Sequence, residues 1–516
     1  MLYFVIFPFL TYSFPVTPDL IEIHLLFQRQ RLMDKFYQAL TLIGFILYWL
    51  LVAGVTIRVV FKPRSVGVSL AWLMIIYIIP VLGVLAYFLI GELNLGRTRG
   101  ERAKAMFTPY EEWFAQVHHC QHHQPNSISH RISSIHNLCS NRVGIPALSG
   151  DTLSLLNTPS EILTAIIQDI EKSEYEVNME FYIWHHGGLA DSVASALIKA
   201  AKRGVTVNVL LDSAGSIDFF KSHWPKLLRN SGVNIVEALS VSPFRMFFRR
   251  LDLRLHRKIV VIDNKIAYTG SMNLVDPQYF KQQSGVGQWV DVMVRITGPN
   301  VAVLNTIHAW DWEVETGIRE LPAPPECQIS IDPFNHTTQV VPSGPGMPDD
   351  IIQQVLITAI NQARTSLTIT TPYFVPSEIL LHTLRTTAHR GVEVKLILPK
   401  KNDSLMVSWA SKSFFETLLK AGVQIYEFNG GLLHTKSVVI DHSYCIIGTV
   451  NLDMRSFWLN FEVSLIVDDP EFTKQLSWVL NSYLDQSTPI ELNEWQQRNL
   501  PHRFTERFFS MFSPLL

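Results

Sequence analysis

A short string of residues occurs twice in this chain, and this repetition constrains the fold more than any other feature of the sequence. The first copy reads LHRKIVVIDNKIAYTGSMN around His256, and the second reads LHTKSVVIDHSYCIIGTVN around His434. Both fit H-x-K-x4-D followed by G-(S/T)-x-N at the same short distance. A single copy would be a weak signal, but two copies indicate a duplicated domain in which each repeat carries half of a site.

The segments around the two strings repeat as well. EILTAIIQDIEKSEYEVNMEFYIW precedes a helix that ends in AAKRGVTVNVLLD, and DIIQQVLITAINQARTSLTITTPYF precedes a helix that ends in TAHRGVEVKLILP. Gly204 and Gly391 follow a basic helix end, where glycine commonly terminates a helix. Each half therefore reads helix, strand, helix, strand, which predicts an α/β fold. The proline-rich LPAPPE segment lies between the halves, so we expect repeat 1 over residues 151–325 and repeat 2 over residues 326–516.

The repeated string carries side chains that suit an anionic phosphodiester. KIVVID and the matching VVID predict strands, so a histidine and a lysine two positions apart point to the same face. This places an imidazole beside a fixed positive charge. The predicted catalytic residues are His256 and Lys258 in the first copy, and His434 and Lys436 in the second.

The other residues that the two strings share are expected to support the histidines and lysines. Asp263 and Asp441 complete the two catalytic motifs, but they lie at the strand end where a turn begins, so we interpret them as structural rather than as nucleophiles. After a second short strand, a turn at Gly270 or Gly448 aims a hydroxyl and an amide at the same phosphate oxygens. The residues concerned are Ser271 and Asn273 in the first copy, and Thr449 and Asn451 in the second.

A carboxylate lies downstream of each string in a segment that resembles a strand. These are Asp291 in QWVDVMVRI and Glu462 in LNFEVSLIV. An imidazole that attacks or protonates must hold one tautomer, and an acidic group on its far nitrogen fixes that tautomer. We therefore expect the two acids to orient the histidines; the alternative is that they are ordinary surface acids. Their spacing from the motifs differs because DPQYFKQQ is inserted in the first half.

Two uncharged segments near the N-terminus, residues 39–57 and 66–90, are each about long enough to cross a bilayer. We expect a transmembrane helical hairpin over residues 36–93. Its link carries Arg58, Lys62 and Arg64, and its flanks carry Arg29, Arg31, Lys35, Arg97, Arg99, Arg102 and Lys104. More basic residues lie in the flanks than in the link, so the positive-inside rule predicts a cytoplasmic catalytic region.

Composition limits the remaining possibilities. A net charge of −2 over 516 residues gives no electrostatic case for nucleic acid. The four cysteines lack C-x-x-C spacing, which indicates a reduced compartment rather than a disulfide framework; they are Cys120, Cys139, Cys327 and Cys445.

We expect residues 94–150 to form a polar linker with helical character. Within it, HHCQHH at residues 118–123 offers metal ligands, but adjacent positions on a helix diverge, so we predict a solvated segment and no metal.

Two further stretches mix arginine with phenylalanine. PFRMFFRRLDLRLHRK lies immediately before the first motif, and RFTERFFSMF lies near the C-terminus. This mixture suits a membrane surface with anionic headgroups. The alternative in both cases is a solvated basic face over core aromatics.

The two strings resemble the motifs of the phospholipase D superfamily. The match extends through GSMNLVDPQYFKQQSGVGQW and GTVNLDMRSFWLNFEV, and with the N-terminal apolar segments it resembles the bacterial cardiolipin synthases from about Met33 to Leu516. Thr449 departs from the usual serine but keeps the hydroxyl. Because the resemblance starts near Met33, we interpret residues 1–35 as an N-terminal extension with a candidate translation start at Met33; MLYFVIFPFL lacks the basic region and cleavage site of a signal peptide.

The resemblance implies two repeats packed about a pseudo-twofold axis, with both motifs in one site. It further implies a phosphatidyltransferase of the bacterial inner membrane, which joins two phosphatidylglycerols into cardiolipin and glycerol through a phosphohistidine, without metal or cofactor. We assign attack on phosphorus to His256 and protonation of the leaving alcohol to His434. Lys258, Lys436, Asn273 and Asn451 would hold the nonbridging oxygens.

Other functions share this core. The alternatives are a lipid hydrolase, a phosphatidyltransferase with another alcohol acceptor, a two-motif nuclease, and an inactive membrane scaffold. Near-neutral charge and the apolar hairpin disfavour the nuclease, and two intact motifs disfavour the scaffold. The expected partners are therefore phosphatidylglycerol, cardiolipin and the membrane, with no nucleic acid; the sequence does not predict an oligomeric state.

Overall fold

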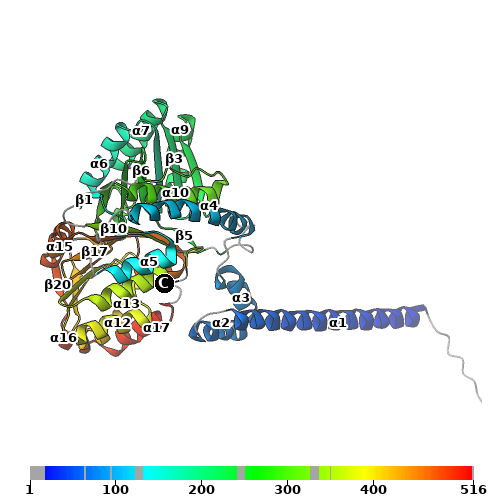
Figure 1. The fold of residues 1–516 in the computed structure, drawn as a ribbon. Helices are drawn as coiled ribbons and strands as arrows, with labels where there is room; N and C mark the ends of the chain where they lie inside the picture. The colour runs from blue at the N-terminus through cyan, green and yellow to red at the C-terminus, as the bar shows by residue number, and fades with distance from the viewer. Residues whose placement is uncertain are drawn as a thin grey trace, which may run out of the picture. The chain divides into compact units, whose positions relative to one another are not determined.

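The computed structural model describes residues 18–62, 66–92, 96–122, 132–240, 250, 252–325, 336–348 and 350–513. The chain divides into two compact units, Met1–Gly91 and Glu92–Leu516, which are drawn in Figure 1. Residues 1–17 of the expected N-terminal extension, and residues 243–249 and 251 of the basic segment before the first motif, lie outside the described residues.

The first unit is helical. It contains α1 (Pro18–Phe61), α2 (Val66–Ile78), α3 (Pro80–Ala86) and the π-helical turn η1 (Tyr87–Gly91). Within α1, the stretch Leu25–Phe61 is long and apolar enough to cross a membrane. The expected second span over residues 66–90 is not one continuous helix, because Pro80 lacks a backbone N–H and divides it into shorter pieces. A hairpin of two spanning helices is therefore not confirmed.

The helices of this unit share a small core. Trp72 packs edge-on against Tyr87 with ring centroids 5.3 Å apart. Buried valines on the last turns of α1 complete the cluster, so α2 and α3 fold back onto α1 rather than extending away from it. The cluster consists of Val52, Val55, Val59, Trp72, Ile76, Val84 and Tyr87.

Repeat 1 in the second unit is built on a seven-stranded sheet in the order β1-β9-β7-β6-β2-β3-β4. Its strands are β1 (Thr152–Leu156), β2 (Glu176–Phe181), β3 (Thr206–Asp212), β4 (Asn234–Ala238), β6 (Ile259–Ile262), β7 (Ile266–Gly270) and β9 (Met293–Thr297). Its helices are α6 (Pro159–Glu171), α7 (Leu189–Lys202), α8 (Ile217–Lys221), α9 (Trp224–Asn230) and α10 (Asn300–Thr316). β2, β3 and β4 run parallel, while β6, β7, β9 and β1 pair antiparallel.

Repeat 2 has the same strand order with one strand added at the edge: β10-β19-β17-β16-β11-β13-β14-β20. Its strands are β10 (Thr337–Ser343), β11 (Ser366–Thr370), β12 (Phe374–Val375), β13 (Glu393–Pro399), β14 (Gln424–Phe428), β16 (Ser437–Ile440), β17 (Tyr444–Gly448), β18 (Leu452–Asp453), β19 (Asn460–Asp468) and β20 (Ser487–Pro489). Its helices are α11 (Ile351–Gln362), α12 (Glu378–His389), α13 (Leu405–Lys420), α14 (Met454–Trp458), α15 (Pro470–Asp485), α16 (Leu492–Gln496) and α17 (Leu500–Ser510). The predicted α/β fold with two similar repeats is confirmed.

Short strands tie the two repeats together reciprocally. β5 (Arg254–Leu255), just before the first motif, pairs in parallel with the start of β19 in repeat 2. β15 (Leu432–Leu433), just before the second motif, pairs in parallel with β8 (Trp289–Val290) of repeat 1. Each repeat therefore has one short strand that precedes its motif and pairs with a strand of the other repeat, as pseudo-twofold symmetry requires. A shared apolar core lies behind these strands and includes Val292 and Val294 of repeat 1 with Val463 and Leu465 of repeat 2.

Two helices lie in the stretch that was expected to be a polar linker. α4 (Arg97–His122) packs against α10, where Arg99 is bonded to Glu315 at 2.7 Å. α5 (Ser133–Val143) packs on repeat 2, and its His136 contacts Gln339 at 2.7 Å. Of the histidine cluster, His118 is described, whereas the side chains of residues 119–131 lie outside the described residues. Within the described parts of the chain, no group of three or more potential ligands is placed to hold a metal ion.

Candidate active site

The two motif histidines are fixed by strand pairing between the repeats. The backbone N–H of His256 donates to the carbonyl of Phe461 at 2.9 Å, and that of His434 donates to the carbonyl of Val290 at 2.8 Å. Because Glu462 follows Phe461 and Asp291 follows Val290, this register brings each histidine beside a carboxylate of the other repeat.

The histidine–carboxylate pairs are therefore crossed. His256 Nδ1 lies 2.8 Å from Glu462 Oε2, and His434 Nδ1 lies 2.6 Å from Asp291 Oδ1. All four side chains are buried. The expected meeting of the two acids with the histidines is present in this geometry, and each acid bonds to the motif histidine of the other repeat.

The hydroxyls of the G-(S/T)-x-N turns bond to the same carboxylates. Ser271 Oγ donates to Asp291 Oδ1 at 2.6 Å, and Thr449 Oγ1 donates to Glu462 Oε2. Since both hydroxyls are buried, they support the orienting acids. The carboxylates lie directly over the turns, and the expected contact of these hydroxyls with phosphate oxygens stays a prediction.

The two motif asparagines, Asn273 and Asn451, each have one buried amide atom without a hydrogen-bond partner. Asn273 Oδ1 accepts from the backbone N–H of Ile183, while its Nδ2 is buried with no hydrogen-bond partner. The amide oxygen assigned to Asn451 is also buried and unpaired, and an amide flip exchanges this atom for a donor. An unpaired buried polar atom is destabilising, so these two positions are suited to a ligand with hydrogen-bonding oxygens.

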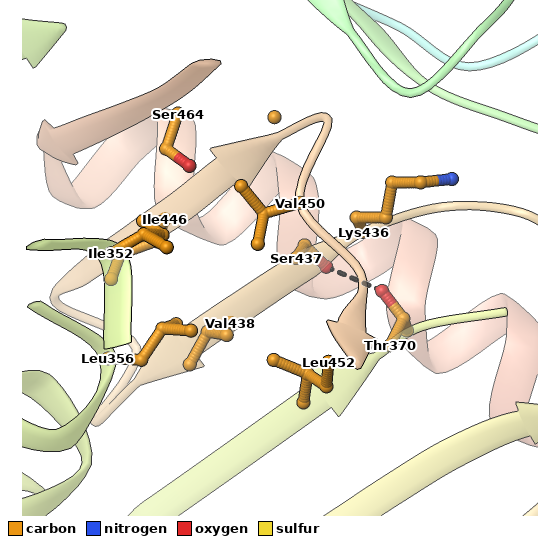
Figure 2. Close-up of a pocket in the computed structure, with 11 residues that line it drawn as sticks. Ile352, Leu356, Thr370, Lys436, Ser437, Val438, Ile446, Val450, Leu452 and Ser464 are labelled. Atoms are coloured by element: carbon orange, nitrogen blue, oxygen red, sulfur yellow. Dashed lines mark hydrogen bonds between the residues drawn. The ribbon is translucent and has the colours of Figure 1, made fainter. Parts of the chain in front are cut away.

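The lysines hold their ammonium groups against the motif backbone. Lys258 Nζ donates to the carbonyl of His256, and Lys436 Nζ donates to that of His434, each at 2.6 Å. An ammonium has three N–H groups, so two remain for another partner. In Figure 2 the Lys436 ammonium points away from a small cavity within repeat 2. That cavity is lined mainly by aliphatic groups such as Leu356 and Val438, which do not suit a phosphate.

Burial sets the charge states of the site. Desolvation lowers the pKa of both His256 and His434 to about 4. It lowers the pKa of Lys258 to about 8 and that of Lys436 to about 7. At neutral pH the two imidazoles are thus neutral.

The pKa values of the two carboxyl groups are also lowered, but burial is not the reason. Burial alone would raise the pKa of Asp291 and Glu462, but the bonded histidine and the nearby lysines outweigh it and hold both values below the usual range. An ionised carboxylate can only accept a hydrogen bond. Each histidine therefore carries its proton on Nδ1, which leaves the Nε2 lone pair free.

Electrostatic contacts join the two motifs into one site. In addition to burial, the charge of Lys436 lowers the pKa of His256, and the charge of Lys258 lowers the pKa of His434. Aromatic rings flank both imidazoles: Tyr182 lies 5.1 Å from His256, and Trp289 lies 4.3 Å from His434, between ring centroids.

The motif aspartates lie away from this centre. Asp263 accepts hydrogen bonds from the backbone N–H groups of residues 174–176, and Asp441 accepts from those of residues 364–366. They fix the start of β2 and β11 on the neighbouring turn. Their interpretation as structural groups agrees with these contacts, and their grouping with the catalytic residues stays a prediction.

Sequence reasoning missed a buried ionic cluster next to the first motif. Arg257 is fully buried, pairs with Asp311 of α10, and donates from Nε to the carbonyl of Glu462 at 3.0 Å. Burial raises the pKa of Glu180 well above its usual value, with the charge of Asp311 acting in the same direction. One signal was available, since Asp311 is an acid within the largely apolar sequence of α10.

A second missed group extends outward from His434. Lys281 Nζ lies 5.3 Å from the centre of the Trp289 ring and 3.0 Å from Asp403 Oδ2. Tyr373 donates to the other oxygen of Asp403 at 2.7 Å. No motif marks these residues, because they come from three separate segments.

The crossed pairs in a duplicated α/β fold define a phospholipase D-like protein. Residues 166–302 and 356–484 match the family described as cardiolipin synthase, PLD-like domain, and residues 50–92 match the family described as phospholipase D-nuclease N-terminal. Cardiolipin synthase A of Yersinia pseudotuberculosis serotype O:1b (strain IP 31758) and cardiolipin synthase A of Yersinia pestis are each 52% identical over 488 residues, which is 94% of this chain and 100% of each relative.

Phosphatidylserine synthase from Haemophilus influenzae Rd KW20 has a similar solved structure. The TM-score is 0.54 at 16% identity, over 75% of this chain and 98% of that one, and this likeness concerns the fold alone. The chain belongs to the phospholipase D-like cardiolipin synthase family. It is accordingly a membrane-associated phosphatidyltransferase whose substrates are phospholipids.

Proposed function

We propose that the protein transfers a phosphatidyl group from one phosphatidylglycerol to a second one, giving cardiolipin and glycerol. The observation that carries this proposal is the reciprocal pairing of His256 with Glu462 and of His434 with Asp291. It supplies two oriented imidazoles in one buried site, and a transfer through a covalent intermediate needs one to attack and one to move a proton.

In the first step, His256 Nε2 attacks the phosphorus of the donor. A P–N bond forms while the P–O bond to glycerol breaks, and His434 gives its proton to the departing glycerol oxygen. The phosphate anion favours the protonated form of His434 once the donor is bound, because opposite charges stabilise each other. Covalent catalysis of this kind replaces one difficult displacement by two easier ones.

In the second step, the headgroup hydroxyl of another phosphatidylglycerol gives its proton to His434 and attacks phosphorus. The P–N bond breaks, which restores neutral His256 and protonated His434. Lys258 and Lys436 offer two N–H groups each to the nonbridging oxygens, and the unpaired amide atoms of Asn273 and Asn451 complete the set. Donors fixed in advance around developing charge stabilise a transition state strongly.

We further propose that α1 anchors the enzyme in the bacterial inner membrane with the catalytic unit in the cytoplasm, as the basic flanks favour. The competing functions are lipid hydrolysis and transfer to a different alcohol. Both would use the same two histidines, and they differ only in what attacks the phosphohistidine.

The test uses purified full-length enzyme in phosphatidylglycerol vesicles that contain EDTA. We expect cardiolipin and free glycerol in equal amounts, and reversal when glycerol is added in excess, because one phosphodiester replaces another. Phosphatidic acid as the main product would instead identify a hydrolase. A requirement for CDP-diacylglycerol with release of CMP, or complete loss of activity on chelation, would overturn the proposal.

A further inference from the structure

The surface of repeat 2 carries a group of exposed apolar side chains at the start of α13 and along α17. We name this group the apolar rim. Leu500, Phe504 and Met511 are 77%, 71% and 77% exposed, which is unusual for side chains of their size in a folded unit. The rim consists of Leu405, Met406, Leu500, Phe504, Phe508 and Met511.

The α17 part of the rim is one continuous stripe. Leu500, Phe504 and Phe508 are four residues apart, so they lie on one side of the helix, and the rings of Phe504 and Phe508 stack with centroids 6.3 Å apart. A surface helix normally exposes a polar side. This helix exposes an apolar stripe beside polar residues such as Arg507, and an exposed apolar stripe marks a surface that contacts a membrane or another protein.

The inner side of α17 is already occupied. Phe509 and Phe512 pack with Val407 and Ala410 of α13. The helix is therefore held on the unit through one face, and the start of α13 meets the end of α17 (Figure 1). Leu405 and Met406 directly precede Val407, so both parts of the rim border the same helix contact.

A chain of contacts leads from His434 to the rim. The ring of Trp289 lies against His434, Lys281 lies over Trp289, and Lys281 pairs with Asp403. Asp403 directly precedes Ser404, whose hydroxyl caps α13 at the residue before Leu405. The part of the rim at the start of α13 is therefore connected to the site where donor and acceptor must arrive.

Basic side chains accompany the stripe. Arg507 is exposed, and Arg503 is partly exposed and lies 3.7 Å from Glu416; each is one position before a rim phenylalanine. A helix that combines exposed aromatics with arginines has the composition of a segment that lies in the interface of an anionic membrane.

We propose that the apolar rim inserts into the headgroup region of the bilayer and holds the active site against the membrane surface. This inference rests on the proposed function for its purpose: lipids with two acyl chains reach the histidines without leaving the bilayer. The anchor α1 would keep the enzyme at the membrane, while the rim would set the orientation of the catalytic unit.

The first experiment measures insertion and needs no turnover. A tryptophan replaces Phe504 in the full-length enzyme, which is reconstituted into phosphatidylglycerol bilayers with brominated acyl chains. We expect the added fluorescence of F504W to be quenched. The matched control is Tyr175→Trp: Tyr175 is 65% exposed and lies beside the turn of Asp263, away from the histidines, so its added fluorescence should not be quenched.

The second experiment measures activity. The double variant Phe504→Ser and Phe508→Ser should lose about tenfold in kcat/KM on vesicles, through a higher KM, because it loses binding rather than chemistry. Its activity on short-chain donor in detergent should match that of the parent, and Tyr175→Ser should lose activity in neither assay. Equal activity of the double variant and Tyr175→Ser on vesicles would overturn the proposal.

The two experiments also distinguish the bilayer from a second copy of the chain as the cover of the rim. Absence of quenching in F504W, together with a change from dimer to monomer in the double variant, would show that a second copy covers the rim and would overturn the proposal. Quenching should persist when His434→Ala is added to F504W. If it does, and cardiolipin is not the product, the docking inference stands while the proposed function fails.

Discussion

His256 is hydrogen-bonded through Nδ1 to Glu462, a carboxylate 206 residues further along the chain and in the other repeat. His434 has the mirror arrangement with Asp291, 143 residues before it. Neither repeat alone can therefore orient its own motif histidine. The site exists only when the two repeats pack, because β5 pairs with β19 and β15 pairs with β8.

The crossed pairs predict which variants behave alike. The assay uses a donor in which p-nitrophenol replaces glycerol, since this leaving group needs no proton. Asp291→Asn should then resemble His434→Asn, with a first release of p-nitrophenol near the wild-type rate and slow formation of cardiolipin. Glu462→Gln should resemble His256→Asn, with the first release itself slowed by at least about 10²-fold and most in His256→Asn, which has no nucleophile.

Glu393→Gln serves as the control, because Glu393 is an exposed acid paired with Lys395 at 2.9 Å; it should release p-nitrophenol at the wild-type rate. The crossed assignment would be refuted if Glu462→Gln released p-nitrophenol normally while Asp291→Asn did not.

The lysines predict the alkaline side of the pH profile. The lowered pKa values, about 8 for Lys258 and about 7 for Lys436, mean that both lose their proton as the pH rises from 6 to 9. The site then holds a phosphate anion less well, so KM for the donor should rise while kcat changes less. On the acid side, activity should fall only as the pH approaches 4, where the nucleophile His256 becomes protonated.

Lys436→Arg tests this interpretation, since a guanidinium remains charged above pH 12. The variant should show a flatter rise of KM between pH 7 and 9, even if its activity is lower throughout. An unchanged profile would assign the alkaline limb to another group.

The first motif is supported by a buried ion pair, and the second is not. Arg257 bonds to Asp311, whereas the matching position in repeat 2 is Thr435, whose hydroxyl lies 3.3 Å from that of Tyr483. Asp311→Ala should lower the free energy of unfolding by about 3–5 kcal/mol, because it leaves a buried charge unpaired. Thr435→Val should lower it by about 1 kcal/mol. Urea unfolding in detergent gives both values, and equal losses would contradict this difference between the repeats.

Much of the catalytic unit could be predicted from local sequence. The IVVI run of β6 is buried on both faces, as a strand inside the fold requires. His256 and Lys258 were expected within this strand, but they lie between β5 and β6. Local pattern cannot show which acid meets which histidine, because that depends on the pairing of β5 with β19 across the repeats. The same limit applies to Arg257, whose partner Asp311 lies 54 residues away.

Other differences left a trace in the sequence. The expected second membrane span contained Pro80, and a proline inside an apolar run predicts a helix break. No sign of the bond between Ser271 and Asp291 is present in the sequence, since a hydroxyl after a glycine turn can donate to a phosphate or to a carboxylate equally well. Only the position of Asp291 over the turn decides between them.

A phosphohistidine at His256 is the central claim, and trapping the covalent intermediate tests it most directly. His434→Asn enzyme is mixed with the p-nitrophenol donor in the absence of an acceptor lipid, stopped at alkaline pH to preserve phosphohistidine, and analysed by mass spectrometry of its peptides. We expect one phosphatidyl group on His256, and none when His256→Asn enzyme is treated in the same way. A phosphatidyl group on any residue other than His256 in either variant, or release of p-nitrophenol without an adduct, would contradict the claim.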